Sequence, residues 1–288
     1  MTDSTAAPSP AEAKRWKDLR KRALSALVLG PSAVACIWLG AEAFTAMVAL
    51  AVAILAWEWV HLCGRRTRVF PGLAVPLVVM AACALAVDDH PRWALALLVA
   101  GFLATWAGAR ALPHTVDQPA GRLAAGVLYI GLAGIALIEL RHDTDAGRAN
   151  VLFLFLVVWA SDIGAYMAGR ALGGPKLWPA VSPNKTWSGA GGGLLAAVAV
   201  GLACALAFQP GAAAGAVVAV AVLLGIASQA GDLLESAIKR HFRVKDTSSL
   251  IPGHGGLLDR LDGVLAAAPV ASLLSFALGY GRTLWGWG

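Results

Sequence analysis

Residues 212–231 read AAAGAVVAVAVLLGIASQAG, and residues 232–262, which follow directly, read DLLESAIKRHFRVKDTSSLIPGHGGLLDRLD. The first segment carries no charge and is long enough to cross a hydrocarbon core about 30 Å thick as a helix. The second holds five of the seventeen acidic residues of the chain, together with five basic residues. Because each charge held at membrane depth costs several kcal/mol, this concentration of charge beside a span indicates the functional region.

Apolar stretches of similar length recur along the chain, which has 288 residues, 58% of them hydrophobic and only 14% charged. A soluble globular domain has about 25% charged residues, so the composition excludes a soluble enzyme. A membrane barrel would instead show alternating segments of ~10 residues. We therefore predict an all-α, polytopic membrane protein of about nine transmembrane helices. The expected spans are 23–40, 43–62, 70–87, 92–109, 123–140, 150–168, 188–208, 212–231 and 261–281.

The distribution of lysine and arginine predicts the orientation, because cytoplasmic loops carry an excess of basic residues. With the N-terminus in the cytoplasm and the C-terminus outside, nineteen of the 23 lysines and arginines fall on the cytoplasmic side. The expected organisation is a disordered basic tail (1–22), an N-terminal transmembrane bundle (23–140) and a catalytic transmembrane domain with cytoplasmic polar loops (150–288). Both polar constellations described below would then face the cytoplasm.

The first polar constellation begins in residues 161–174, which read SDIGAYMAGRALGG. Asp162 and Tyr166 lie four residues apart in a predicted span and therefore share one helix face. An ionisable residue at membrane depth is a candidate for function. The alternative is a helix-packing face with a satisfied buried acid.

The same constellation continues in residues 181–193, VSPNKTWSGAGGG. Ser182 and Pro183 predict a helix start, with serine as the N-cap and proline at the first helical position. Lys185 and Thr186 would then lie in the first turn, where free N–H groups and the helix dipole favour a phosphate. An ordinary capped helix fits this feature equally well. The glycine run that follows indicates close helix packing.

The second constellation begins where the span 212–231 ends. If that helix continues, Asp232, Glu235, Ser236 and Lys239 form one stripe of two acids, a hydroxyl and a cation. Basic side chains beside such acids would neutralise phosphate charge. The alternative is a solvated loop in which the acids and bases simply pair.

Further along, residues 252–256 form a flexible PGHGG turn that opens onto Asp259 and Asp262. These two aspartates lie three residues apart at the start of the last span, so carboxylates from two helix ends can converge on a hard cation. Mg²⁺ usually takes one or two carboxylates together with substrate phosphates. The pattern indicates a membrane enzyme that handles phosphorylated substrates with Mg²⁺.

Residues 236–262 resemble, without a gap, the signature of the phosphatidate cytidylyltransferases, also called CDP-diacylglycerol synthases. The elements at 162–170 and 182–186 are similar to those of the same family. One departure is visible: Ser188-Gly189 stands where members of the family commonly carry Glu-Gly.

The resemblance implies the reaction CTP + phosphatidate → CDP-diacylglycerol + pyrophosphate, a step of phospholipid biosynthesis, at the cytoplasmic face of the inner membrane. The implied partners are CTP, phosphatidate and the lipid bilayer, with no nucleic acid, and a homodimer is left open. Mg²⁺ is the implied cofactor, with room for a second cation such as K⁺. The implied catalytic residues are Asp232, Lys239, Asp259, Arg260 and Asp262, of which Asp232, Asp259 and Asp262 would hold Mg²⁺. The implied substrate-binding residues are Asp162, Tyr166, Ser182, Lys185, Thr186, Ser236, Arg240, Lys245, His254, Gly255 and Gly256.

Three other functions compete with this one. A related CTP-dependent enzyme, such as a polyprenol kinase or an ether-lipid cytidylyltransferase, would differ only in its acceptor. A CDP-alcohol phosphotransferase would carry a D-G-x-x-A-R run before two further aspartates, which this chain lacks. A cation transporter would place polar residues in mid-span, whereas Glu42, Glu58 and Glu139 lie near predicted span ends.

Overall fold

The computed structural model describes residues 27–112, 119–141, 145–251, 255–279 and 281–286. Within these residues, seven helices are long and apolar enough to cross a membrane, and two apolar helices are shorter. The prediction of an all-α, polytopic membrane protein is confirmed. The two shorter helices are Leu27–Leu39 and α3 (Ala74–Val87). The seven longer ones are α2 (Ala41–Leu62), α4 (Pro91–Ala111), α5 (Ala120–Arg141), α6 (Asp145–Leu172), α7 (Trp187–Phe208), α8 (Ala214–His241) and α9 (Leu258–Leu278).

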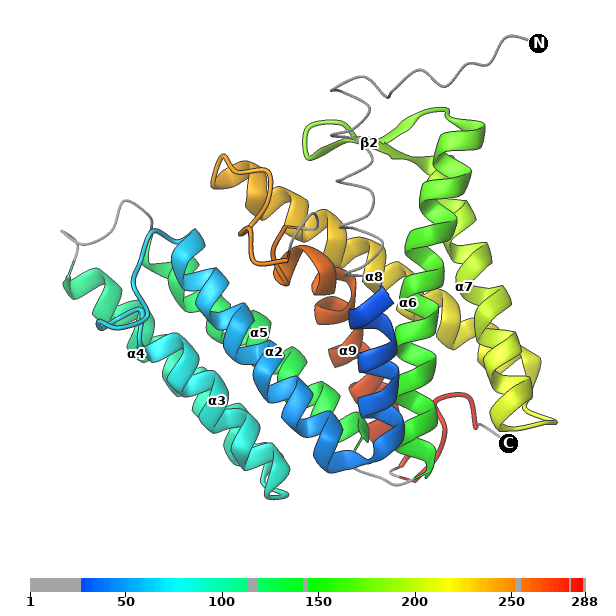
Figure 1. The fold of residues 1–288 in the computed structure, drawn as a ribbon, viewed down its shortest axis with the longest axis horizontal. Helices are drawn as coiled ribbons and strands as arrows, with labels where there is room; N and C mark the ends of the chain where they lie inside the picture. The colour runs from blue at the N-terminus through cyan, green and yellow to red at the C-terminus, as the bar shows by residue number, and fades with distance from the viewer. Residues whose placement is uncertain (1–26, 113–118, 142–144, 252–254, 280, 287–288) are drawn as a thin grey trace, which may run out of the picture.

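The helices form two groups that meet along α5 and α9 (Figure 1). Helices α2 to α5 pack together on one side, and on the other side α6 packs along α7 and α8 along α9. The ends of α2 and α8 and the connection between α6 and α7 lie at the same end of the bundle, uppermost in Figure 1. The two polar constellations therefore share one end of the molecule. Which side of the membrane that end faces stays a prediction.

Helix α8 extends ten residues beyond the predicted span 212–231 and ends at His241. Two residues later, Arg243 has a left-handed backbone (φ 57°). Its 28 residues make it about 42 Å long, more than the hydrocarbon core requires. Basic residues in its last turn complement the negative end of the helix dipole. The predicted stripe of Asp232, Glu235, Ser236 and Lys239 thus lies on a real helix, and it need not enter the hydrocarbon.

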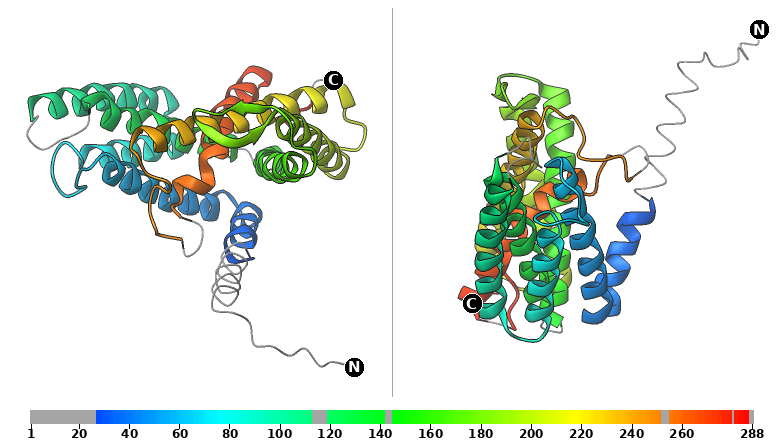
Figure 2. Two further views of the ribbon diagram at one scale, coloured as in Figure 1. Left: turned by 90° about the horizontal axis from the view of Figure 1, so that it is seen from above. Right: turned by 90° about the vertical axis from the view of Figure 1, so that its left-hand side faces the viewer.

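The prediction of a helix start at Ser182 is wrong. Residues Ser182–Thr186 form a strand, β2, which pairs antiparallel with β1 (Lys176–Trp178). The two strands make a small hairpin between α6 and α7 that reaches over α8 (Figure 2). Helix α7 begins at Trp187, and the hydroxyl of its N-cap, Thr186, accepts a hydrogen bond from the Gly189 N–H at 3.1 Å. Threonine caps a helix much as serine does. The residues just before the cap form backbone hydrogen bonds with β1.

Helices α6 and α7 approach closely through small residues, as the glycine run in α7 predicted. A Cβ atom on Gly192 would lie 2.2 Å from the Cβ atom of Ala168, and one on Gly164 would lie 2.4 Å from that of Ala196. Larger side chains would push the two helices apart. This packing fixes the hairpin and Asp162 on one rigid pair of helices.

Candidate functional site

Three carboxylates converge at the end of the bundle where α8 meets α9. Asp232 and Glu235 of α8 and Asp262 of α9 each offer an oxygen, and these oxygens lie within 4.8 Å of one another. The close approach of the two helices depends on Gly231, where a Cβ atom would lie 2.5 Å from the Asp262 carbonyl oxygen. Carboxylate oxygens are the ligands that hard divalent cations prefer. The donor set therefore fits a hard divalent cation.

Lys239 lies beside this acidic group, between two buried carboxylates. Its Nζ atom is 2.5 Å from Glu235 Oε2 and 2.9 Å from Asp259 Oδ1. The Glu235 side chain is fully buried, and the Asp259 side chain is only 2% exposed. The ammonium group of Lys239 thus links the acidic stripe on α8 to Asp259 at the start of α9.

Asp259 is held by the loop before α9 more than by the acidic group. Its Oδ2 atom accepts hydrogen bonds from the Thr247 N–H and hydroxyl, both at 2.9 Å, and from the Gly256 N–H at 2.8 Å. The turn that delivers Gly256 requires a left-handed backbone at Gly255 (φ +83°), which glycine adopts freely. Among the described residues, then, Glu235 takes the third place in the carboxylate group that was predicted for Asp259.

The hairpin forms a second wall of the site. Lys185 Nζ lies 2.6 Å from Asp232 Oδ2, and Arg240 Nε donates to the Val181 carbonyl at 3.3 Å. Lys185 thus reaches the acidic group from a strand and not from the first turn of a helix. Thr186 is buried, and its hydroxyl caps α7 by accepting the hydrogen bond from Gly189.

Asp162 and Tyr166 lie on the exposed face of α6, next to these elements. Asp162 is within electrostatic reach of Asp232, Lys185 and Arg260. The Tyr166 hydroxyl accepts a hydrogen bond from Arg170 at 2.8 Å. The structure therefore brings the two constellations together.

The remaining predicted site residues differ in their surroundings. Ser182 and Ser236 are half-buried, while Arg240, Lys245 and Arg260 are exposed. His254 lies outside the described residues. Ser188, at the position where the family commonly has glutamate, donates its hydroxyl to the Gly173 carbonyl and lies 3.0 Å from the Thr186 hydroxyl. It supports the hairpin and not the acidic group.

One residue of the site region was missed as a candidate. Glu58 of α2 is fully buried, and its carboxylate accepts hydrogen bonds from Ser248, Leu257 and Leu258. The sequence showed only a single acid near the end of an apolar run, which is a weak signal because no local partner accompanies it.

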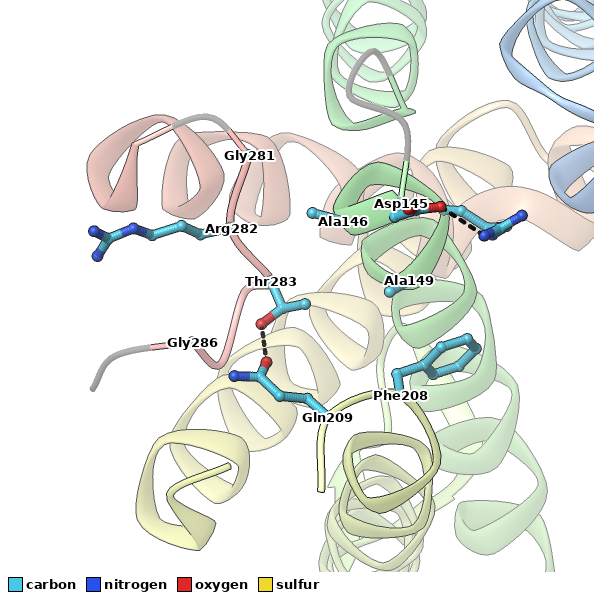
Figure 3. A pocket seen from close by; sticks show the side chains of 10 residues that line it. Asp145, Ala146, Ala149, Phe208, Gln209, Gly281, Arg282, Thr283 and Gly286 are labelled. Carbon is cyan, nitrogen blue, oxygen red and sulfur yellow. Dashed lines mark hydrogen bonds and ion pairs between the residues drawn. The ribbon is translucent and has the colours of Figure 1, made fainter. Parts of the chain in front are cut away.

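A separate hollow of about 590 Å³ lies at the opposite end of the bundle (Figure 3). It is lined in part by Asp145, Arg282 and Thr283, and the Thr283 hydroxyl donates to Gln209 Oε1 at 2.6 Å. None of its lining residues belongs to the acidic group or the hairpin, so it takes no part in the candidate site.

Comparison with known proteins agrees with this chemistry. Residues 20–278 match the model of the cytidylyltransferase family. A phosphatidate cytidylyltransferase of Brucella suis biovar 1 (strain 1330) is 42% identical over 263 residues, which cover 89% of this chain and 93% of that protein. Proteins of the same name from Staphylococcus saprophyticus (41% over 148 residues, 51% of this chain and 56% of that protein) and Bacillus subtilis (strain 168; 35% over 182 residues, 63% and 67%) are also similar.

Proposed function

The chain belongs to the cytidylyltransferase family, and from that premise we propose that it is a phosphatidate cytidylyltransferase. It transfers CMP from CTP to phosphatidate and releases CDP-diacylglycerol and pyrophosphate. The observation that carries the proposal is the group of Asp232, Glu235 and Asp262, with basic residues around it, at one end of an apolar helical bundle. A site at a helix end can receive a water-soluble nucleotide and a bilayer lipid together.

In the proposed reaction, a phosphate oxygen of phosphatidate attacks the α-phosphorus of CTP, and the bond to the β-phosphate breaks as pyrophosphate leaves. Such a transfer depends on positioning and charge neutralisation, because the substrate supplies its own nucleophile. Mg²⁺ would neutralise charge on the phosphates, and a second cation such as K⁺ would be held nearby. Asp232, Glu235 and Asp262 would hold the Mg²⁺. Asp259, already engaged by four donors, would keep Lys239 and the loop in place.

The basic side chains would divide the remaining phosphate charge. Lys185 approaches from the hairpin and Lys239 from α8, while Arg240, Lys245 and Arg260 are exposed at the same end of the bundle. Exposed arginines suit this role because the guanidinium group binds phosphate through two parallel hydrogen bonds. Asp162 and Tyr166 would line the same site from α6.

The purified protein in detergent micelles, given labelled CTP, phosphatidate and Mg²⁺, is expected to form labelled CDP-diacylglycerol and one pyrophosphate per product. Omitting Mg²⁺ or adding a chelator should abolish the product. Parallel reactions with a polyprenol or an ether-lipid phosphate test the acceptor. Transfer of the γ-phosphate of CTP to the polyprenol, with release of CDP and with no product from phosphatidate, would make the protein a CTP-dependent lipid kinase instead.

We further propose that the site lies on the cytoplasmic side of the inner membrane, because CTP is a cytoplasmic nucleotide. The excess of lysine and arginine on the loops at that end supports this orientation. A reporter fused after Gly288 is expected to score as non-cytoplasmic, and one fused before residue 23 as cytoplasmic. Equal cytoplasmic signals from both fusions would contradict the predicted topology.

A further inference from the structure

Helix α9 begins without a cap from its own sequence. Its N-cap residue is Leu257, whose side chain cannot accept a hydrogen bond and so does not cap the helix. The first N–H groups of a helix have no partner within the helix. Asp259 and Asp262 lie in the first two turns of α9, so the position of this helix start matters for the site.

Glu58 supplies the missing cap from α2, about two hundred residues earlier in the chain. Its Oε2 atom accepts from the Leu258 N–H at 2.7 Å, and its Oε1 atom accepts from the Leu257 N–H at 2.8 Å and from the Ser248 hydroxyl at 2.6 Å. A negative charge is favoured at the N-terminus of a helix by the helix dipole. The three hydrogen bonds and the helix dipole thus compensate for the cost of burying the Glu58 carboxylate completely.

The same carboxylate fixes the loop that holds Asp259. Ser248, which donates to Glu58, follows Thr247, which donates twice to Asp259. On the other side of the loop, a Cβ atom on Gly256 would lie 2.7 Å from Glu58 Oε1, and the Gly256 N–H donates to Asp259. Glu58 and Asp259 therefore hold opposite sides of one segment of backbone.

The position of Asp262 depends on where α9 begins. Successive residues of a helix are rotated by about 100°, because a turn contains 3.6 residues. A shift of the helix start by one residue would turn the Asp262 carboxylate away from Asp232 and Glu235. The hydrogen bonds that Leu257 and Leu258 donate to Glu58 oppose such a shift.

We propose that Glu58 is a positioning residue for the cation site: from the N-terminal bundle it caps α9 and fixes the described parts of the loop before it, at 247–248 and 256–258, which sets Asp262 in the carboxylate group. This inference rests on the proposed function for its effect on the reaction, whereas its effect on the loop and on cation binding does not. It also gives the N-terminal bundle a direct part in building the site.

Glu58→Gln keeps the shape of the side chain, removes its charge and turns one of its two acceptors into a donor. The amide protons of Leu257 and Leu258 are then expected to exchange with solvent about tenfold faster or more, because hydrogen bonds to a charged group are strong ones. The Mg²⁺ concentration for half-maximal activity should rise about ten- to a hundredfold, as for other residues that orient metal ligands. Saturating Mg²⁺ should restore part of the rate. Hydrogen exchange and the Mg²⁺ titration measure these effects.

Glu42→Gln is the matched control, because Glu42 lies on the same helix but is exposed in its first turn; neither measurement should change. Faster exchange in Glu58→Gln with an unchanged Mg²⁺ requirement would overturn the proposal, since the cap would then be structural only. Unchanged exchange would overturn it as well. If Glu58→Gln does not fold, Ser248→Ala, which removes one donor, should raise the Mg²⁺ requirement severalfold, and no change there would overturn the proposal.

Cation binding without substrates separates this inference from the proposed function. Mn²⁺ replaces Mg²⁺ as a spectroscopic probe, and its affinity for the full chain is measured by electron paramagnetic resonance without nucleotide or lipid. Weaker Mn²⁺ binding in Glu58→Gln than in Glu42→Gln supports the positioning role even if no acceptor lipid is found. Equal affinities in the two variants would overturn it even if the wild-type enzyme makes CDP-diacylglycerol.

Discussion

Asp262→Asn is expected to lower kcat/KM for CTP by about a thousandfold or more while the protein remains folded. Asp262 joins Asp232 and Glu235 across the contact of α8 and α9, and asparagine leaves the shape of the site unchanged while removing a charge. A metal ion contributes several kcal/mol of charge stabilisation in phosphoryl transfer, and each ~1.4 kcal/mol is a factor of ten in rate. Formation of CDP-diacylglycerol from labelled CTP, measured over a range of Mg²⁺ concentrations, provides the test.

Asp88→Asn serves as the control, since Asp88 follows α3 at the other end of the bundle and its side chain is 83% exposed. Its activity should match that of the wild type. Asp232→Asn should behave like Asp262→Asn, because both residues would hold the same cation. Activity that survives in both site variants to within a few fold would remove the proposed Mg²⁺ site.

The spans and the course of α8 could be predicted because both follow from local sequence. Backbone groups in a bilayer must be satisfied within the segment, so an apolar run of sufficient length becomes a helix. No proline or glycine interrupts the chain between Asp232 and His241, so the helix continues and its spacing places Asp232, Glu235 and Lys239 on one face. The resemblance to phosphatidate cytidylyltransferases then identified the nucleotide and the lipid as expected substrates. The spacing of the residues alone did not identify them.

The parts that sequence reasoning missed depend on partners far away in the chain. Ser182-Pro183 has the composition of a helix start, but pairing with β1 makes it a strand. The resemblance assigned Asp259 to the cation, and the donors that the loop offers to this carboxylate could not be predicted from spacing. Glu58 is about two hundred residues from the helix that it caps, and no local pattern records such a contact.

Lys239→Met is expected to lower the free energy of unfolding by about 3–5 kcal/mol, because removing one partner leaves a buried charge without compensation. Lys239 separates the carboxylates of Glu235 and Asp259, which are 0% and 2% exposed. Methionine fills a similar volume without the ammonium group, so the loss reports charge and not packing. Denaturant unfolding in detergent micelles measures the stability, and the CTP assay on the folded fraction should show little product.

Lys185→Met is the matched comparison within the same site. Lys185 also pairs with an aspartate, Asp232, but the two side chains are 26% and 35% exposed. The Lys185 Nζ atom itself is buried, but water can reach the half-exposed carboxylate of Asp232 once the lysine is gone. This variant should therefore lose less stability than Lys239→Met. Equal losses in the two variants would contradict the assignment of Lys239 as the cation on which the buried acids depend.

A second substitution separates folding from catalysis at Lys239. Asp259 keeps its three loop donors when Lys239 is replaced, so Glu235 is the carboxylate left without compensation. Adding Glu235→Gln to Lys239→Met removes that charge, and most of the lost stability should return. Activity should not return, because the carboxylate group then lacks one of its three acids and the site lacks the ammonium group of Lys239. Recovery of both properties would mean that Lys239 serves only to neutralise Glu235. Recovery of stability alone would show that the buried pair is kept for the reaction, since the fold would be stable without either charge.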